Sequence, residues 1–135
     1  MLHNVNHIGI AVQSLEASIG FYQDALAMPL QGIEEIAGQK VRVAMLQVGE
    51  SKIELLEPTS PDSPIARFLE KNGPGIHHIA YEVADIEAAI AQLTQSGVRM
   101  IDESPRAGAH GSRIAFLHPK SSGGVLTELC QVKYS

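Results

Sequence analysis

The chain has 135 residues, of which 44% are hydrophobic and 19% are charged, and its formal net charge is −5. This length and composition predict one globular domain that is large enough to bury a core. The acidic balance excludes a typical nucleic-acid-binding protein, because such proteins need a basic surface. No segment has the roughly 20 consecutive apolar residues that span a bilayer, and we expect no signal peptide. The single Cys130 cannot form an internal disulfide, which is typical of cytoplasmic proteins.

The first half of the chain predicts the element order βαβββ. Residues 5–12 alternate as a strand does, so that His7, Gly9 and Ala11 share one face. Ser14 can cap a helix over residues 15–27, because its hydroxyl can accept a hydrogen bond from the first helical turn. Three further strands are expected at residues 30–36, 40–48 and 52–56.

The second half of the chain predicts the same order of elements. A strand over residues 76–83 precedes Asp85, which can cap a helix that Gly97 ends. The further strands are expected at residues 99–103, 113–117 and 126–132. Between the two halves lies a linker rich in Pro and Gly, in which Ser63-Pro64 can begin a short helix over residues 65–71.

This internal repeat predicts an α+β fold of tandem βαβββ modules. We expect the two modules to form a cupped, mixed β-sheet with pseudo-twofold symmetry, because a half of about 60 residues buries little surface alone. We predict a single domain over residues 1–135, with the first repeat at about 3–57, a linker at 58–75 and the second repeat at about 76–132.

Each predicted module carries one His on its first strand and one Glu on its last strand. His7 corresponds to His78, 71 residues later, and Glu54 corresponds to Glu128. A lone His in an apolar strand is usually a hydrogen-bonded core residue, but the same two polar residues recur at equivalent places. Imidazole and carboxylate groups are ligands for borderline divalent ions, and buried carboxylates need partners. A metal site is therefore the favoured interpretation.

The other histidines have different expected roles. His77 points away from the face of His78, so we expect it to be structural, and we expect His3 to lie on the surface. Residues 104–127 contain no acidic residue, although the chain as a whole is acidic. The basic side chains in this segment are Arg106, His110, Arg113, His118 and Lys120. These residues are either solvated surface groups or a binding surface for an anionic substrate.

The chain resembles the vicinal oxygen chelate superfamily, which includes glyoxalases, bleomycin resistance proteins and dioxygenases. Within it, the local sequences are most similar to the methylmalonyl-CoA epimerase family. The similar segments span nearly the whole chain: His7-Ile8-Gly9-Ile10-Ala11-Val12, Ile53-Glu54-Leu55-Leu56-Glu57-Pro58, Gly75-Ile76-His77-His78-Ile79-Ala80, Gly108-Ala109-His110-Gly111, Phe116-Leu117-His118-Pro119-Lys120 and Gly123-Gly124-Val125-Leu126-Thr127-Glu128-Leu129.

The resemblance implies a glyoxalase-like fold and a metal site. His7, His78 and Glu128 would bind a divalent ion, and Glu54 would complete the set. Co²⁺ or Zn²⁺ is expected, with Mn²⁺ or Ni²⁺ as alternatives. Some relatives have Gln at the position of Glu54 and a Glu, proposed as a base, at the position of Val43. This departure suggests that Glu54 supplies the missing carboxylate.

The implied reaction is the metal-dependent epimerisation (2R/2S) of methylmalonyl-CoA. A proton would be removed and returned through an enolate that the metal stabilises. Glu128 and Glu54 would be both ligands and acid–base residues, one for each face of the substrate. His110, Arg113 and Lys120 are the expected substrate-binding residues. A cytoplasmic homodimer is also expected, because members of the superfamily are often dimers.

Three other functions remain open from the sequence. A glyoxalase I-type lactoylglutathione lyase uses the same kind of metal site on a glutathione hemithioacetal. An extradiol dioxygenase uses two His and one Glu on Fe(II), but such enzymes tend to be longer. A non-catalytic small-molecule-binding protein tends to line its cleft with aromatic residues. This chain has only six Phe and Tyr residues and no Trp, which argues against the last of these functions.

Overall fold

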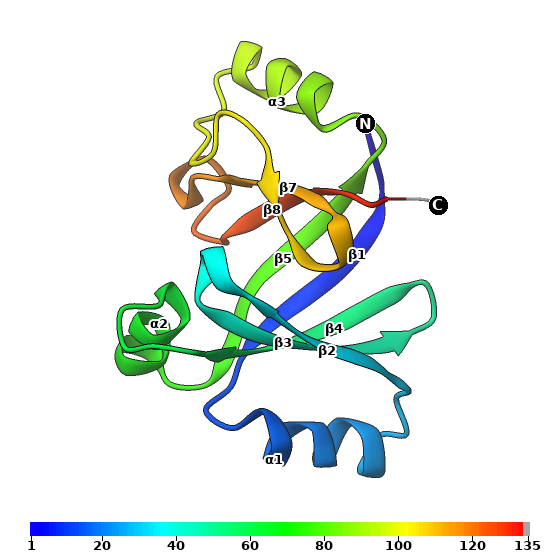
Figure 1. Ribbon diagram of the computed structural model, residues 1–135. Helices are drawn as coiled ribbons and strands as arrows, with labels where there is room; N and C mark the ends of the chain where they lie inside the picture. Colours follow the sequence, from blue (N-terminus) through cyan, green and yellow to red (C-terminus); the bar gives the residue numbers. More distant parts are fainter. Residues whose placement is uncertain (134–135) are drawn as a thin grey trace. The chain divides into compact units, whose positions relative to one another are not determined.

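A computed structural model of the protein, which describes residues 1–133, has the predicted α+β architecture with two βαβββ modules (Figure 1). The chain divides into two compact units. The N-terminal unit comprises residues 7–77, and the C-terminal unit comprises residues 1–6 together with the chain from residue 78 onward. Strand β1 (Leu2–Ala11) and strand β5 (Gly75–Val83) therefore each belong partly to both units.

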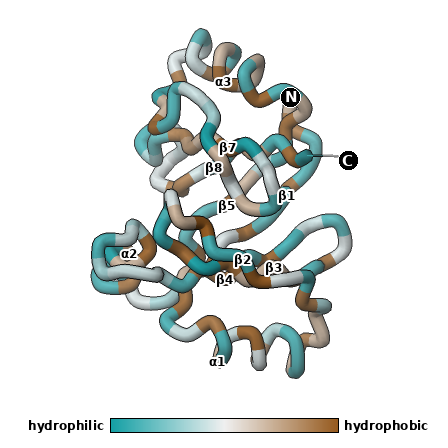
Figure 2. Tube along the Cα trace, viewed as in Figure 1, coloured by the Kyte–Doolittle hydropathy of each residue, from teal (hydrophilic) through white to brown (hydrophobic). Residues whose placement is uncertain are grey.

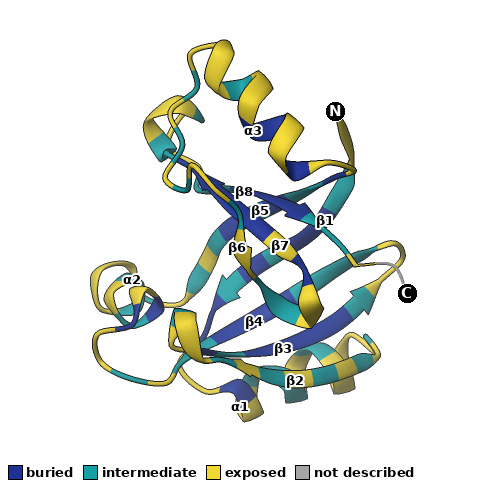
Figure 3. Ribbon diagram, turned by 45° about the horizontal axis from the view of Figure 1, so that its top comes forward, coloured by how far each residue is buried: buried dark blue, intermediate teal, exposed yellow. Residues whose placement is uncertain are grey.

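The N-terminal unit contains a mixed sheet with strand order β2-β3-β4-β1. Strand β4 runs parallel to β1, whereas the β2–β3 and β3–β4 pairs are antiparallel. The bounds of the three new strands are β2 (Leu30–Ile36), β3 (Val41–Val48) and β4 (Ser51–Pro58). All three agree with the predicted ranges to within two residues. Figure 3 shows that β3 is largely buried and that β4 is buried in its middle and half-buried towards its ends, while exposed residues alternate along β2.

One face of this sheet packs against helix α1 (Leu15–Ile19), which continues as a π-helical segment (Gly20–Ala25). The Ser14 hydroxyl caps the helix by accepting a hydrogen bond from the Ala17 N–H at 3.3 Å, as predicted. The buried residues of this hydrophobic core are Val12, Leu15, Ala44, Leu46 and Leu55. Helix α2 (Pro64–Asn72) begins after Ser63, whose hydroxyl accepts from the Ile65 N–H.

The C-terminal unit repeats this plan with strand order β5-β8-β7-β6. Strand β8 runs parallel to β5 and antiparallel to β7. Helix α3 (Ile86–Gln95) covers one face of the sheet and is capped by Asp85, as predicted. The bounds of the other strands are β6 (Arg106–Ala107), β7 (Arg113–Leu117) and β8 (Thr127–Gln131). Hydrophobic segments lie on both α1 and α3 among hydrophilic ones (Figure 2), as in helices with one buried face.

The strand predicted at residues 99–103 is wrong. Its pairing with β7 is irregular: it forms an isolated bridge between Met100 and Leu117, and the N–H groups of Ile101 and Asp102 both donate to the Phe116 carbonyl oxygen. The Asp102 carboxylate accepts the N–H of Phe116 at 2.9 Å, so a side chain takes the place of a backbone partner at this edge. The edge strand beside β7 is instead β6, which has only two residues.

None of the helices within residues 1–133 has the length and apolar character needed to traverse a bilayer.

We predict that Gly108→Ala will lower the free energy of unfolding by about 1–3 kcal/mol, the usual cost of overpacking a core. A Cβ atom at this position would lie 2.6 Å from Ser112 Oγ and 2.7 Å from Ile114 Cγ2. Both neighbours are buried, so neither can move freely. Gly38→Ala is the matched control, since its Cβ would have no heavy atom within 4 Å. Equal stability of both variants in urea denaturation would contradict the prediction.

Candidate functional site

The first His–Glu pair lies in the N-terminal unit, on the sheet face opposite α1. His7 Nδ1 lies 3.4 Å from Glu54 Oε2, and both side chains are less than 10% exposed. In the parallel pairing of β1 with β4, Glu54 stands opposite Gly9, and His7 stands opposite Lys52. His7 therefore reaches Glu54 diagonally, and Gly9 leaves room because it has no side chain.

The second pair has the same local geometry within the C-terminal unit. His78 Nε2 lies 3.2 Å from Glu128 Oε1, and both side chains are again buried. In the parallel pairing of β5 with β8, Glu128 stands opposite Ala80, the small residue that corresponds to Gly9. The His–Glu contact is diagonal here too. The repeat seen in the sequence is therefore a repeat of local structure, including the small residue that makes space for the imidazole.

The ligand chemistry of these residues fits a divalent metal ion. His7, Glu54 and His78 are all buried and each offers a nitrogen or a carboxylate oxygen of the kind that holds a metal, and Glu128 offers a further carboxylate. Burying an ionised carboxylate is costly unless a positive charge or hydrogen-bond donors compensate for it. Two imidazoles and two carboxylates are suitable donors for Zn²⁺ and similar ions.

The residue that packs against the His78 imidazole was not predicted from the sequence. The Phe116 ring contacts the His78 ring edge to face, with 5.4 Å between ring centroids. Phe116 stands directly opposite Glu128 in the β7–β8 pairing, so it lies on the same face of the sheet. An apolar residue within a strand carries no sequence signal for this contact, because the contact depends on strand register.

His77, expected to be structural, and His3, expected on the surface, both lie away from the His–Glu contacts. His77 packs its ring against Phe68 of α2, with 5.0 Å between centroids, and His3 is exposed. Val43 is buried and pairs with Glu34 on one side and Leu56 on the other. The position at which some relatives carry a Glu therefore holds a buried apolar side chain in this chain, on the sheet face that also carries Glu54.

The three expected substrate-binding residues lie in different local settings. Arg113 is exposed and forms an ion pair with Glu87 of α3, so it belongs to the helix-covered side of the sheet. His110 is exposed in a 3₁₀ turn (Ala109–Gly111) and adopts a left-handed conformation, with φ of 56°. Lys120 is exposed in a second turn (Pro119–Ser121). Register thus separates Arg113 from the face that carries Glu128.

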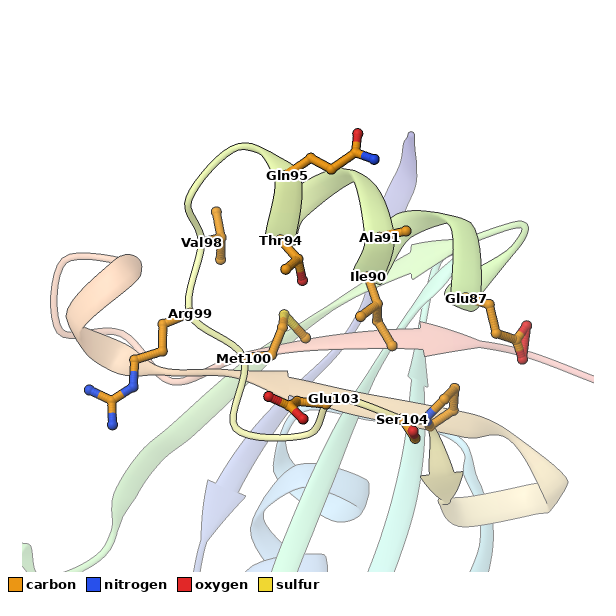
Figure 4. A pocket seen from close by; sticks show the side chains of 11 residues that line it. Glu87, Ile90, Ala91, Thr94, Gln95, Val98, Arg99, Met100, Glu103 and Ser104 are labelled. Atoms are coloured by element: carbon orange, nitrogen blue, oxygen red, sulfur yellow. The ribbon is translucent and has the colours of Figure 1, made fainter.

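A shallow cleft of about 850 Å³ lies between α3 and the segment that follows it (Figure 4). Ile90 and Met100 point into this space, while Arg99 points away from it. Neither member of the His78–Glu128 pair lines this cleft. It lies on the helix-covered side of the sheet, whereas the His–Glu pair lies on the opposite side.

We predict that His118 will titrate below its ordinary pKa of 6.5. Desolvation lowers this pKa most, and the positive charges of Arg99 and Lys120 lower it further. The imidazole therefore favours its neutral form, and any stability that it contributes is present above pH 6.5 and lost as the pH falls. In NMR titrations, Arg99→Gln and Lys120→Gln should each raise the midpoint, though not fully to 6.5. A midpoint that neither variant raises would contradict this prediction.

Comparisons with known proteins agree on one superfamily. Residues 6–116 match the glyoxalase/bleomycin resistance protein/dioxygenase superfamily. The chain is 44% identical to an ethylmalonyl-CoA/methylmalonyl-CoA epimerase of Cereibacter sphaeroides, over 98% of this chain and 100% of that protein. Two solved structures each align with 97% of this chain, and each alignment includes 95% of the solved chain. One is a methylmalonyl-CoA epimerase in complex with methylmalonyl-CoA and ammonium (44% identity, TM-score 0.94), and the other is a hypothetical protein of Bacillus halodurans (50% identity, TM-score 0.95).

Proposed function

Because the chain belongs to the glyoxalase/bleomycin resistance protein/dioxygenase superfamily, we propose that it is an isomerase that interconverts the 2R and 2S epimers of methylmalonyl-CoA. The observation that carries this proposal is the pair of buried His–Glu contacts on equivalent strands. The near full-length similarity to epimerases that act on this coenzyme A thioester supports it.

We further propose that both His–Glu pairs bind a single divalent ion, Co²⁺ or Zn²⁺, or alternatively Mn²⁺ or Ni²⁺. The chain passes from one unit to the other between Asn6 and His7, and again between His77 and His78. Both proposed histidine ligands therefore stand at the covalent junctions of the units. When bound, the ion would supply positive charge beside the thioester oxygen, where negative charge develops as the proton leaves.

The two glutamates are the acid–base residues of this proposal. Epimerisation requires a proton to be removed from one face of C2 and a proton to be delivered to the other. Glu128 would serve one face, and Glu54 would serve the other, because the repeat places one carboxylate in each module. Val43 cannot hold a proton, so Glu54 would take the role that a Glu at that position has been proposed to have in relatives.

Contacts with the rest of the substrate are proposed for the basic residues of the C-terminal unit. His110 and Lys120 lie in exposed turns, where they could contact the anionic coenzyme A portion. Arg113 was expected to join them, but its ion pair with Glu87 would first have to open. We also propose that the protein acts in the cytoplasm and that it is a homodimer. Analytical ultracentrifugation can test the dimer.

We predict that Glu54→Gln and Glu128→Gln will each slow solvent-deuterium incorporation at C2 of methylmalonyl-CoA by about 10²-fold or more, the usual contribution of a positioned acid or base. The exchange reports proton removal directly. Glu70→Gln on α2 is the matched control, because Glu70 is exposed. Undiminished exchange in Glu54→Gln would exclude Glu54 from the acid–base role.

Removal of the metal should abolish epimerisation, and Co²⁺ or Zn²⁺ should restore it. The metal-free protein should also unfold at a lower temperature, since its buried carboxylates would lack a compensating charge. His78→Ala should lose metal in elemental analysis, whereas His3→Ala, at an exposed position, should retain it. Full activity after exhaustive chelation would contradict the metal role. Isomerisation of a glutathione hemithioacetal without any epimerisation of methylmalonyl-CoA would instead identify a glyoxalase.

A further inference from the structure

We propose that Arg106 binds the free carboxylate of the substrate acyl group and thereby selects dicarboxylic acyl thioesters. This inference rests on the proposed epimerase function, and it names a residue that sets substrate specificity at the same site. Arg106 is one of three formally charged basic residues within the acid-free segment 104–127. The structure distinguishes it from the other two by its face of the sheet and its contacts.

Strand register places Arg106 on the face that carries Glu128. Arg106 stands opposite Ile114 in the antiparallel β6–β7 pairing, and directly opposed residues point to the same side of a sheet. Ile114 and Phe116 share a side because side chains alternate along β7. Phe116 in turn stands opposite Glu128. Arg113 is one residue before Ile114 and therefore points to the α3 side, where Glu87 binds it.

A continuous series of contacts joins Arg106 to the second His–Glu pair. The Arg106 guanidinium lies over the Phe116 ring, with Cζ 5.5 Å from the ring centroid. The same ring contacts the His78 imidazole, and His78 contacts Glu128. The guanidinium and the imidazole therefore contact the same aromatic ring. An anionic group of a substrate held beside His78 and Glu128 would lie close to this positive charge.

The orientation of the guanidinium also suits a carboxylate. Arg106 forms an ion pair with Asp102 through Nε, which lies 3.3 Å from one carboxylate oxygen and 3.4 Å from the other, and Asp102 also accepts the Phe116 N–H. These contacts hold the guanidinium by its Nε. They do not involve the two Nη groups, which no other residue within 1–133 is shown to contact. Two parallel N–H donors are the geometry that binds a carboxylate with two hydrogen bonds. The Arg106 side chain is 44% exposed, so a ligand can reach it.

The test compares two ligands that differ only in the carboxylate. Dissociation constants of methylmalonyl-CoA and propionyl-CoA are measured by calorimetry on metal-loaded wild type, Arg106→Gln and Arg106→Lys. Arg106→Gln should weaken methylmalonyl-CoA binding by about 10- to 100-fold, the effect expected for losing charged hydrogen bonds, and should leave propionyl-CoA binding unchanged. Arg106→Lys should recover part of the loss, because it keeps the charge without the paired donors.

Arg67→Gln is the matched control, since Arg67 is exposed on α2 and its guanidinium donates to the Asp62 carbonyl oxygen. Equal weakening of both ligands in Arg106→Gln would place the residue at the coenzyme A portion and overturn the inference. The preference for methylmalonyl-CoA is the dissociation constant of propionyl-CoA divided by that of methylmalonyl-CoA. An unchanged preference in Arg106→Gln, with a reduced preference in Arg113→Gln, would also overturn the inference. In either case wild type still epimerises methylmalonyl-CoA. A wild type that neither binds nor epimerises this thioester would refute the proposed function itself.

Discussion

The diagonal contact between a histidine and a glutamate on parallel neighbouring strands is the constraint on which both modules depend. In each module the glutamate stands opposite a small residue, Gly9 or Ala80, and the imidazole from two residues earlier fills the space. A larger residue at either position would compete with the imidazole for that space. A buried carboxylate is costly without compensation, and each module holds one, so the proposed metal would supply a compensating charge.

The two faces of each sheet carry different residues: one face packs into the hydrophobic core, and the other carries the proposed site. In the N-terminal unit, α1 packs against a core that includes Leu46 and Leu55, whereas the opposite face carries His7 and Glu54. In the C-terminal unit, α3 covers a core that includes Leu129, and the opposite face carries His78, Glu128 and Phe116. Because side chains alternate along a strand, one strand can supply the core and the site at once. The wall of the proposed site is thereby held by the same strands that hold the core.

The same alternation distinguishes basic residues that are near one another in the sequence. Arg106 and Arg113 carry the same charge, yet one contacts Phe116 and the other contacts Glu87. The local positive charge of the acid-free segment is therefore divided between two sides of a sheet. An anionic substrate at the His78–Glu128 face would experience Arg106 at short range. Arg113 lies on the other side of the sheet, in an ion pair with Glu87.

The sequence by itself determined the element order, the helix caps and the identity of the His and Glu residues. Ser14 and Asp85 cap their helices as predicted, because capping depends on residues within one turn. The repeat identified His7, Glu54, His78 and Glu128, since their spacing recurs along the chain. Tertiary structure decided the rest. The Asp102 side chain accepts the Phe116 N–H where a strand was predicted, Arg113 lies on the α3 side of the sheet, and Phe116 lies against His78. These outcomes depend on which strands become neighbours and in which register they pair. Local sequence does not specify either one, because both are set by residues far apart along the chain.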